Sequence, residues 1–307
     1  MAPSVQFPGE TRVIDLMIGV PAVERTEWYR QFDGLIRDEE SRGHLRHGAG
    51  YMYKQPPEVV VDETLPKFLV DEMDRYGVEQ AMIPVSFPEP IGRAAVRLYP
   101  DRFLASYYVD PNLGMQGVRD LERAVNELGV VAATAFPAGY FPQVAINDKR
   151  FYPLYAKCIE LDIPMFVNAG VPGPRFPMEV QHVKLLDEVC WFFPELRLVT
   201  RHGCEPWEDL AVKLMLKYPN LYYSTSAFAP KYYPESIVKY ANTRGADKVM
   251  FAGYFPSGLS YERIFSELPN VPFRPHVWPK FLRENALAVL GRRRPAAPAE
   301  ETATPVA

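Results

Sequence analysis

The sequence predicts a (β/α)8 barrel, also called a TIM barrel, formed by a single domain over residues 1–291. About eight apolar runs of strand length alternate with amphipathic helical stretches along the chain. The runs show no polar alternation, as expected for parallel strands that helices cover on both faces. No glycine-rich phosphate loop follows any strand, which disfavours the alternative, an open doubly wound sheet.

The first predicted strand lies within residues 12–21, where an apolar run ends in the turn Gly19-Val20-Pro21. This strand carries a carboxylate, Asp15, in its middle. An unpaired ionised carboxylate in an apolar interior costs several kcal/mol. Asp15 is therefore expected to meet a partner, or to stand at the mouth of the strand and face a polar pocket.

Residues 22–63 form a segment rich in charge, glycine and aromatic residues, and it is too long for an ordinary connection. We expect it to be an insertion that acts as a lid over the barrel mouth. Its aromatic and basic side chains are candidates for substrate binding, namely Tyr51, Tyr53, Lys54 and His47. The spacing of His44 and His47 on one helix face would also allow a metal pair, but solvated surface is favoured because no carboxylate or cysteine accompanies them.

The remaining chain supplies the other strands and their helices. Strands are expected at 80–85, 102–109, 130–136, 164–168, 196–202, 221–226 and 248–252. Helices are expected at 65–76, 91–98, 115–127, 150–161, 178–192, 206–217 and 233–243. Residues 292–307 are rich in proline and alanine without apolar periodicity, so we expect a disordered tail there.

Composition limits the classes of partner and compartment. A net charge of −4 provides no basic field for nucleic acid or an anionic membrane, and no apolar run reaches the ~20 residues that a membrane span needs. The first residues lack the features of a signal peptide. Three cysteines, an odd number without metal-ligand spacing, suit reduced thiols. We therefore expect a cytoplasmic protein that acts on a small molecule.

Several motifs resemble the amidohydrolase-related family of barrels that includes aminocarboxymuconate-semialdehyde decarboxylase, resorcylate-type decarboxylases and lactone hydrolases. In chain order these motifs are Val13-Ile14-Asp15, Asp74-Arg75-Tyr76-Gly77-Val78, Tyr99-Pro100-Asp101-Arg102-Phe103, Val199-Thr200-Arg201-His202-Gly203, Tyr218-Pro219-Asn220-Leu221-Tyr222, Ala252-Gly253-Tyr254-Phe255-Pro256 and Glu284-Asn285-Ala286. The resemblance extends over almost the full length. It implies the same barrel, metal-assisted hydrolysis or decarboxylation, and a homodimer or larger homo-oligomer.

The sequence departs from the family at the expected metal ligands. Family members follow the first-strand aspartate with His-x-His, and those two places here hold Met17 and Gly19. Asn168 stands where the fifth-strand histidine is expected, and the eighth-strand aspartate is absent. A zinc-like ion requires three or four imidazole, thiolate or carboxylate ligands. We therefore expect no cofactor and no family-type metal; the alternative is a weak rebuilt site at Asp15, His202 and Glu205.

Polar residues at the ends of the predicted strands are the candidate site, because the carboxyl ends of barrel strands form the active face. His202 is the expected proton-transfer residue, with Asp15 or Glu205 to orient it. Each of these residues has a structural alternative. His202 could be a core histidine, and Asp15 could only accept backbone N–H bonds. Glu205 could stabilise the amino end of the following helix electrostatically. Further strand-end candidates are Thr134, Asn168, Arg201, Ser224, Ser226 and Tyr254, of which Asn168, Arg201 and Tyr254 are assigned to substrate binding.

Three hypotheses about function follow. The first is a metal-independent hydrolase or carbon–carbon lyase, such as a decarboxylase, for a small cyclic or aromatic carboxylate. The second is a hydratase, dehydratase or isomerase on the same barrel, which needs only proton transfers. The third is a non-catalytic ligand-binding barrel.

Overall fold

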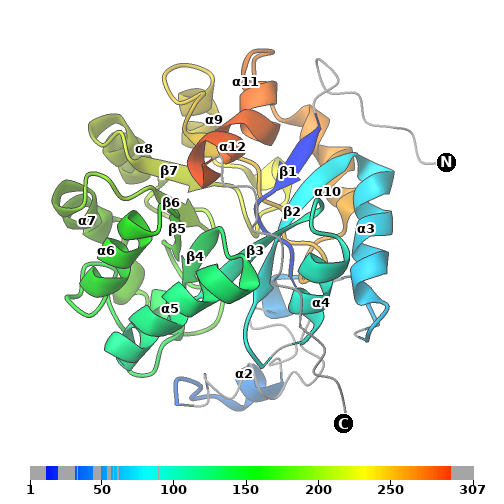
Figure 1. The fold of residues 1–307 in the computed structure, drawn as a ribbon. Helices are drawn as coiled ribbons and strands as arrows, with labels where there is room; N and C mark the ends of the chain where they lie inside the picture. The colour runs from blue at the N-terminus through cyan, green and yellow to red at the C-terminus, as the bar shows by residue number, and fades with distance from the viewer. Residues whose placement is uncertain are drawn as a thin grey trace, which may run out of the picture.

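The structure is a computed structural model that describes residues 12–19, 32, 34–43, 50–53, 57, 59–60, 62–88 and 90–291. Eight strands lie side by side in the order β1 to β8, each parallel to the next, and helices surround them (Figure 1). This confirms the predicted (β/α)8 barrel. The expected tail at 292–307 lies outside the described residues.

The strands closely follow the predicted runs. They are β1 Val13–Asp15, β2 Val78–Val85, β3 Phe103–Tyr108, β4 Ala132–Ala135, β5 Met165–Asn168, β6 Leu198–Arg201, β7 Leu221–Ser224 and β8 Val249–Met250. The helices are α2 Glu39–Gly43, α3 Leu65–Tyr76, α4 Pro90–Leu98, α5 Met115–Leu128, α6 Tyr152–Glu160, α7 Leu186–Phe192, α8 Glu208–Lys217, α9 Glu235–Ala241, α10 Tyr261–Glu267, α11 Val277–Pro279 and α12 Asn285–Leu290. None of the described helices has both the length and the apolar character needed to cross a membrane.

Helix α3 shows how the sequence forms the outer layer. Leu65, Leu69 and Met73 recur at a spacing of four residues and are fully buried, so one face of the helix packs on the sheet. The helix ends where Gly77 takes a left-handed conformation with φ of 72°. Strand β2 begins at the next residue, which places the helix directly against the strand that follows it.

One predicted helix is shorter than expected. The stretch 178–192 contains two 3₁₀ turns, at Glu179–Gln181 and Val183–Leu185, before α7 begins at Leu186. The interruption falls at His182, whose backbone is extended (φ −62°, ψ 133°) and whose Nδ1 accepts the Lys184 N–H. Gln181, before it, donates to the Gly170 carbonyl at 2.7 Å and accepts from the Ala138 N–H at 3.3 Å. These bonds tie the loops after β4 and β5 together, which a continuous helix would not do.

Side chains that point into the barrel form a separate core. Ile14, Met82, Leu104, Phe166, Val199 and Met250 belong to it, and Ala286, Val289 and Leu290 of α12 pack against them and close one end. Successive residues of a strand point to opposite faces. Asn168 and Arg201 lie two residues after Phe166 and Val199, so their side chains face the barrel interior at the carboxyl end.

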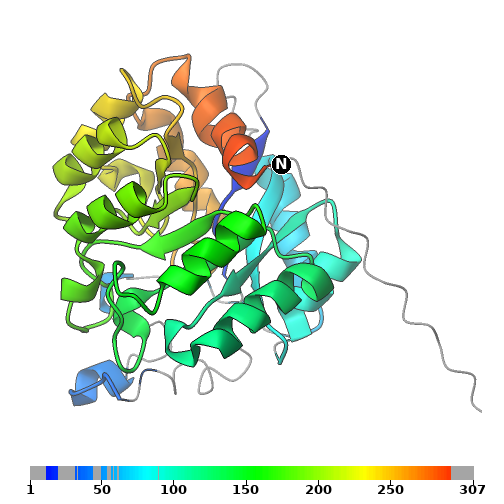
Figure 2. The same cartoon turned by 60° about the vertical axis from the view of Figure 1, so that its left-hand side comes forward.

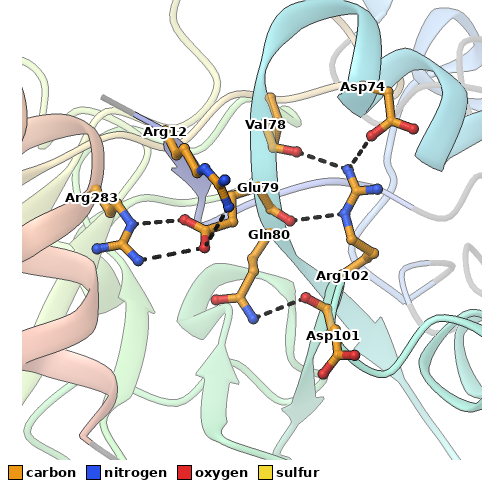
Figure 3. A network of polar contacts seen from close by, with 8 residues as sticks. All are labelled: Arg12, Asp74, Val78, Glu79, Gln80, Asp101, Arg102 and Arg283. Atoms are coloured by element: carbon orange, nitrogen blue, oxygen red, sulfur yellow. Dashed lines mark hydrogen bonds and ion pairs between the residues drawn. The ribbon is translucent and has the colours of Figure 1, made fainter. Parts of the chain in front are cut away.

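Ion pairs hold the amino-terminal end of the barrel (Figure 3). Glu79 of β2 pairs with Arg283 at 2.7 Å and with Arg12 at 3.8 Å, which joins β1 and β2 to the π-helix Lys280–Glu284 before α12. Arg102 pairs with Asp74 at 2.8 Å and also donates to the carbonyl of Glu79. The groups are partly exposed, so each pair contributes at most about 1 kcal/mol to stability.

The opposite end carries the described part of the predicted lid, including α2, and lies across the barrel from α12 (Figure 2). Phe32 packs against Phe136 and Phe176, with ring centroids 6.0 and 5.4 Å away, in the loops that follow β4 and β5. Arg175 pairs at 2.9 Å with Asp38, directly before α2, and at 2.9 Å with Glu40 within it. The segment therefore contacts the loops at the carboxyl ends of the strands.

The barrel closes between β8 and β1 through few bonds, since β8 has only two residues. The Leu16 N–H donates to the Phe251 carbonyl at 3.3 Å, and the Gly19 N–H to the Phe255 carbonyl at 2.8 Å. Between them, the Gly253 N–H donates to Asp15 Oδ1 at 2.7 Å. A side chain therefore completes the backbone ladder at this seam.

This seam generates the first prediction. A Cβ atom at Gly253 would lie 2.6 Å from Asp15 Oδ2, so Gly253→Ala must displace the carboxylate or the strand. We expect the substitution to lower the free energy of unfolding by roughly 1–3 kcal/mol, as overpacking of a buried site does. Denaturant unfolding measures this change, and an unaltered midpoint would show that the seam tolerates the extra methyl group.

Candidate functional site

Arg201 and Asn168 are paired in register as the last residues of β6 and β5. Asn168 is 8% exposed, and Arg201 is partly buried with its Nε fully enclosed and without a hydrogen-bond partner. Neither side chain forms a hydrogen bond or an ion pair with another residue in the described part of the chain. The guanidinium lies over the Phe166 ring at 5.9 Å. A cation held without a partner at the barrel mouth favours an anionic ligand.

Arg201 remains charged in this setting. Burial lowers the pKa of its guanidinium to about 10, against the opposing influence of Tyr254 and Asp15. The group is therefore still a cation at neutral pH. Among the described residues, no carboxylate forms an ion pair with it to offset its desolvation.

His202 follows Arg201 on a strained turn. His202, Gly203 and Cys204 have φ values of 63°, 85° and 63°, so three consecutive residues occupy the left-handed region. The His202 N–H donates to Ser226 Oγ at 3.1 Å, and the same oxygen lies 3.3 Å from His202 Nδ1. A non-glycine residue in this conformation costs about 1 kcal/mol or more, and such residues cluster at functional sites.

The environment keeps His202 neutral. Burial, followed by the charge of Arg201, lowers the pKa of His202 to about 3 from its usual 6.5. An anion bound to Arg201 would offset the second of these effects and raise the pKa of His202. Binding of an anion to Arg201 and protonation of His202 are thus linked through the positive charge of Arg201.

Two tyrosines stand beside His202. The Tyr254 ring meets the imidazole edge to face, with centroids 5.6 Å apart, and it stacks on Tyr53 at 5.6 Å. Tyr53 donates to the Ala227 carbonyl at 2.9 Å, and burial raises its pKa. A Cβ atom at Gly258 would lie 2.7 Å from the Tyr53 ring, so the glycine permits this packing. Tyr53 therefore joins the predicted lid segment to the loops after β7 and β8.

Asp15 has partners other than His202. Its Oδ1 accepts the Met17 and Gly253 N–H groups at 2.9 and 2.7 Å, and its Oδ2 accepts the Tyr261 hydroxyl of α10 at 3.0 Å. No hydrogen bond between Asp15 and His202 exists among the described residues. The carboxylate points outward from β1, as its partner on α10 requires, so the expected orienting pair does not form. The contacts of Asp15 match the structural role considered for it above, that of a carboxylate that accepts backbone N–H bonds.

Glu205 is also not joined to His202. Its carboxyl group is half-buried and forms no hydrogen bond with another described residue, and burial, followed by the charge of Glu208, raises its pKa. Its main-chain carbonyl accepts the Val171 N–H at 2.8 Å. Ser226, rather than either carboxylate, is the residue that contacts the imidazole nitrogen.

The donor atoms present do not fit a divalent metal ion. Within the described ranges, no three or more His, Cys, Asp or Glu side chains converge as a metal site would require, so Asp15, His202 and Glu205 do not form the rebuilt site considered above. The Asp15 oxygens already accept three hydrogen bonds. The amide of Asn168 is a weak ligand for such an ion compared with a histidine.

The other sequence candidates lie farther out or cannot be placed. Tyr51 is 53% exposed and donates to the Gly173 carbonyl at 2.6 Å, with Arg175 over its ring at 5.5 Å. His47 and Lys54 fall outside the described residues. Thr134 and Ser224 donate to main-chain carbonyls of neighbouring strands and so are satisfied within the sheet.

Two residues at this end were not predicted. The Tyr108 hydroxyl, on β3, is buried, and its ring lies beside that of Tyr140 with centroids 5.5 Å apart. Strand alternation from Leu104 would have indicated that it faces the barrel interior. Tyr261 was not foreseen as the partner of Asp15, because the two residues are 246 positions apart and no local pattern joins them.

Comparisons with known proteins are consistent with this architecture. A family model described as Amidohydrolase matches residues 76–292. The 2-keto-4-carboxy-3-hexenedioate hydratase of Sphingobium sp. is 28% identical over 125 residues, which are 35% of this chain and 37% of that protein. The match thus spans little more than a third of that relative.

Solved structures share the fold at low identity. An uncharacterised TIM-barrel protein of Bordetella bronchiseptica has a TM-score of 0.72 at 22% identity, covering 91% of this chain and 98% of that one. The 5-carboxyvanillate decarboxylase of Novosphingobium aromaticivorans, solved with bound manganese, has a TM-score of 0.68 at 16% identity, covering 94% and 99%. At these identities the likeness establishes the fold.

The environment of Asp15 leads to a prediction about pH. Burial raises the pKa of Asp15 from 3.8 to about 6, so its protonated form is favoured in the folded state. Protonation of Asp15 therefore stabilises the folded state. This stabilisation is fully present below pH 3.8 and is lost as the pH rises through 6. Asp15→Asn keeps an acceptor oxygen and cannot ionise. Its stability relative to the wild type should therefore increase by up to about 3 kcal/mol between pH 4 and pH 7.

Urea unfolding at several pH values measures this difference. Asp71→Asn, at an exposed acid on α3, is the control, and its difference from the wild type should stay within about 0.5 kcal/mol across the range. A constant difference for Asp15→Asn across the range would show that the carboxylate is already ionised without cost.

Proposed function

The chain belongs to the amidohydrolase family of enzymes, and from that premise we propose that it is a metal-independent lyase or hydrolase for a small cyclic or aromatic carboxylate. The observation that carries this proposal is the Arg201 guanidinium, which lies at the barrel mouth next to Asn168 and His202 and has no partner among the residues that the structure describes. A substrate carboxylate is the anion that this site would accept. Decarboxylation is the reaction that we favour.

Arg201 and its aromatic neighbours support the substrate class. A guanidinium binds a carboxylate through two parallel hydrogen bonds, and the low dielectric of the site strengthens them. The Phe166 ring lies under the guanidinium, and Tyr254 stands in edge contact with His202. Flat aromatic walls favour a planar, conjugated substrate over a flexible one.

His202 is the proposed acid–base residue, held in place by its contacts with Ser226 and Tyr254. It is neutral before the substrate binds, and a carboxylate on Arg201 would raise its pKa toward the working range. Glu205, whose carboxyl group is half-buried at the same strand end, is a second proposed proton-transfer group. Tyr53 is proposed to help exclude water from the site.

Hydration is the second candidate reaction. The relative from Sphingobium is named a hydratase, and hydration of a conjugated carboxylate needs only proton transfers and the same carboxylate anchor. Both reactions place negative charge on the conjugated part of the substrate. The described residues would serve either one, and the substrate decides between them.

We also propose a cytoplasmic location and a homo-oligomeric state. The cysteines Cys158, Cys190 and Cys204 are free and buried, which suits a reducing compartment. The oligomeric state rests on the family resemblance alone.

The first experiment concerns metal dependence. We expect the purified protein to contain no stoichiometric zinc or manganese and to keep its melting temperature in the presence of a chelator, because the Asp15 oxygens accept other hydrogen bonds and no three His, Cys, Asp or Glu side chains converge among the described residues. Elemental analysis and thermal unfolding measure both. About one metal ion per chain, together with loss of stability in chelator, would contradict metal independence.

The second experiment tests the carboxylate anchor. A panel of aromatic carboxylates and the matching carboxamides is screened by thermal shift. A carboxylate at 100 times its Kd should stabilise the fold by about 2.7 kcal/mol, and the carboxamides should have little effect. Arg201→Met should abolish the stabilisation by carboxylates.

Arg197→Met is the control variant, because Arg197 precedes the same strand at its other end and pairs with Asp162 at 2.7 Å. It should bind the panel as the wild type does. Equal stabilisation of the wild type and Arg201→Met by the same carboxylates would overturn the proposed anchor.

A further inference from the structure

The Tyr53 ring lies in a slot that the loop after β8 forms. It stacks on the Tyr254 ring, with centroids 5.6 Å apart and an angle of 22° between the two planes. A Cβ atom at Gly258 would lie 2.7–2.8 Å from three atoms of the Tyr53 ring, so a glycine is needed there to leave room for it. The Gly258 N–H donates to the Tyr254 carbonyl at 3.0 Å, which closes a turn and brings both sides of the slot together.

The Tyr53 hydroxyl is attached to the neighbouring loop, which follows β7. It donates to the Ala227 carbonyl at 2.9 Å. Ala227 has a left-handed backbone, with φ of 73°, and its N–H donates to the Gly253 carbonyl at 3.1 Å. A non-glycine residue rarely adopts this conformation unless its surroundings hold it there. Tyr53 is thus bound where the loops after β7 and β8 are joined.

Both attachments of Tyr53 lead to His202. Tyr254 meets the His202 ring edge to face, with centroids 5.6 Å apart. Ser226, the residue before Ala227, accepts the His202 backbone N–H at 3.1 Å, and its Oγ lies 3.3 Å from His202 Nδ1. Among the described residues, Tyr53 has no hydrogen bond or ring contact with His202 itself. Its influence on the imidazole therefore passes through these neighbours.

We propose that Tyr53 is a positioning residue for His202: its ring holds Tyr254, and its hydroxyl holds the loop that carries Ser226. The importance of His202 for a reaction rests on the proposed function, whereas the positioning itself rests on the contacts of Tyr53. Proton transfer requires the imidazole to meet the reacting atom within hydrogen-bonding reach. A misplacement of about 1 Å can cost about a hundredfold in rate. A residue outside the barrel strands would thus set how well the acid–base group is placed.

The alternative for Tyr53 is a purely structural role, and Tyr51 provides the comparison. The Tyr51 hydroxyl also donates to a main-chain carbonyl, that of Gly173, at 2.6 Å. Its side chain is exposed, and Arg175 lies over its ring. Both tyrosines therefore tie the segment Gly50–Tyr53 to loops at the barrel mouth, but among the described residues Tyr53 is the one that stacks on a neighbour of His202.

Proton NMR of the histidine rings in the full chain tests the proposal. The chain has five histidines, and the His202 signals are identified by their loss in His202→Asn. The spectra are recorded at about pH 9, where the imidazole is neutral even if its pKa returns to the usual value of about 6.5. The signals then report the surroundings of the ring and not its protonation. Tyr254→Ala is the reference for a His202 ring that has lost its aromatic neighbour.

Tyr53→Ala should move the His202 signals most of the way to their positions in Tyr254→Ala, because the stack that holds Tyr254 is lost. Tyr53→Phe keeps the stack and should recover most of the wild-type positions. Tyr51→Phe is the matched control and should leave the signals unchanged. Unchanged signals in folded Tyr53→Ala would overturn the proposal, since a purely structural role would alter the melting temperature and not the His202 signals.

Gly258→Ala displaces the Tyr53 ring without changing Tyr53 itself, because the added methyl group takes the place of the ring. It should shift the His202 signals as Tyr53→Ala does. The double variant should show no shift beyond that of Tyr53→Ala, since the two residues act as a unit. Additive shifts in the double variant would mean that Gly258 acts on Tyr254 through the turn alone, which would count against the proposal.

These measurements need no ligand, so their result is separate from that of the carboxylate-anchor experiment. If no carboxylate stabilises the wild type while the His202 signals move as expected, the proposed function is wrong and the positioning by Tyr53 stands. If carboxylates bind while the His202 signals stay in place in both Tyr53→Ala and Gly258→Ala, the proposed function stands and the positioning by Tyr53 is refuted.

Discussion

The hydrogen bond from the Gly253 N–H to the Asp15 carboxylate is the interaction on which the barrel mouth depends. Strand β8 has only two residues, so the backbone ladder between β8 and β1 is too short to hold the closure alone. A side chain from β1 reaches across and takes the place of a ladder bond. The cost of burying this carboxylate is offset in part by two N–H donors and the Tyr261 hydroxyl, and the remainder raises its pKa to about 6.

The seam also sets the geometry of the site. Tyr254 follows Gly253 directly, and its ring contacts both His202 and Tyr53. The absence of a side chain at Gly253 lets the Asp15 carboxylate approach within 2.6 Å of the place a Cβ atom would occupy. One glycine thus connects the closure of the barrel to the position of Tyr254 at the next residue.

The charge pattern at the ends of β5 and β6 is unusual for a region so well packed. Arg201 has no partner among the described residues, the histidine after it is neutral, and Asp15 bonds to Met17, Gly253 and Tyr261 instead. The strained turn at 202–204 keeps this arrangement in place. The desolvation of an unpaired guanidinium is an electrostatic cost that the proposed anion would relieve, which is how preorganised sites gain affinity.

Much of the fold was predictable from local patterns. Apolar runs and amphipathic spacing located the eight strands, because burial of one face is a property of short segments. The helix expected at 178–192 was too long, since the bonds of Gln181 to Gly170 and Ala138 involve residues distant in the chain. Of the candidate site residues, Asn168, Arg201 and His202 lie at the ends of neighbouring strands as expected from the sequence, whereas Asp15 and Glu205 form no hydrogen bond with the imidazole among the described residues.

The sequence by itself determined the barrel, the end of it that carries the polar residues, and the loss of the family's histidine ligands, because these depend on residue type and spacing along one strand. Only the tertiary structure decided the partners of those residues. Asp15 bonds to Gly253 and Tyr261, and His202 to Ser226, across separations of 238, 246 and 24 residues. Side-chain direction at a closing seam depends on how β1 and β8 meet in space, and no periodicity in either strand contains that information.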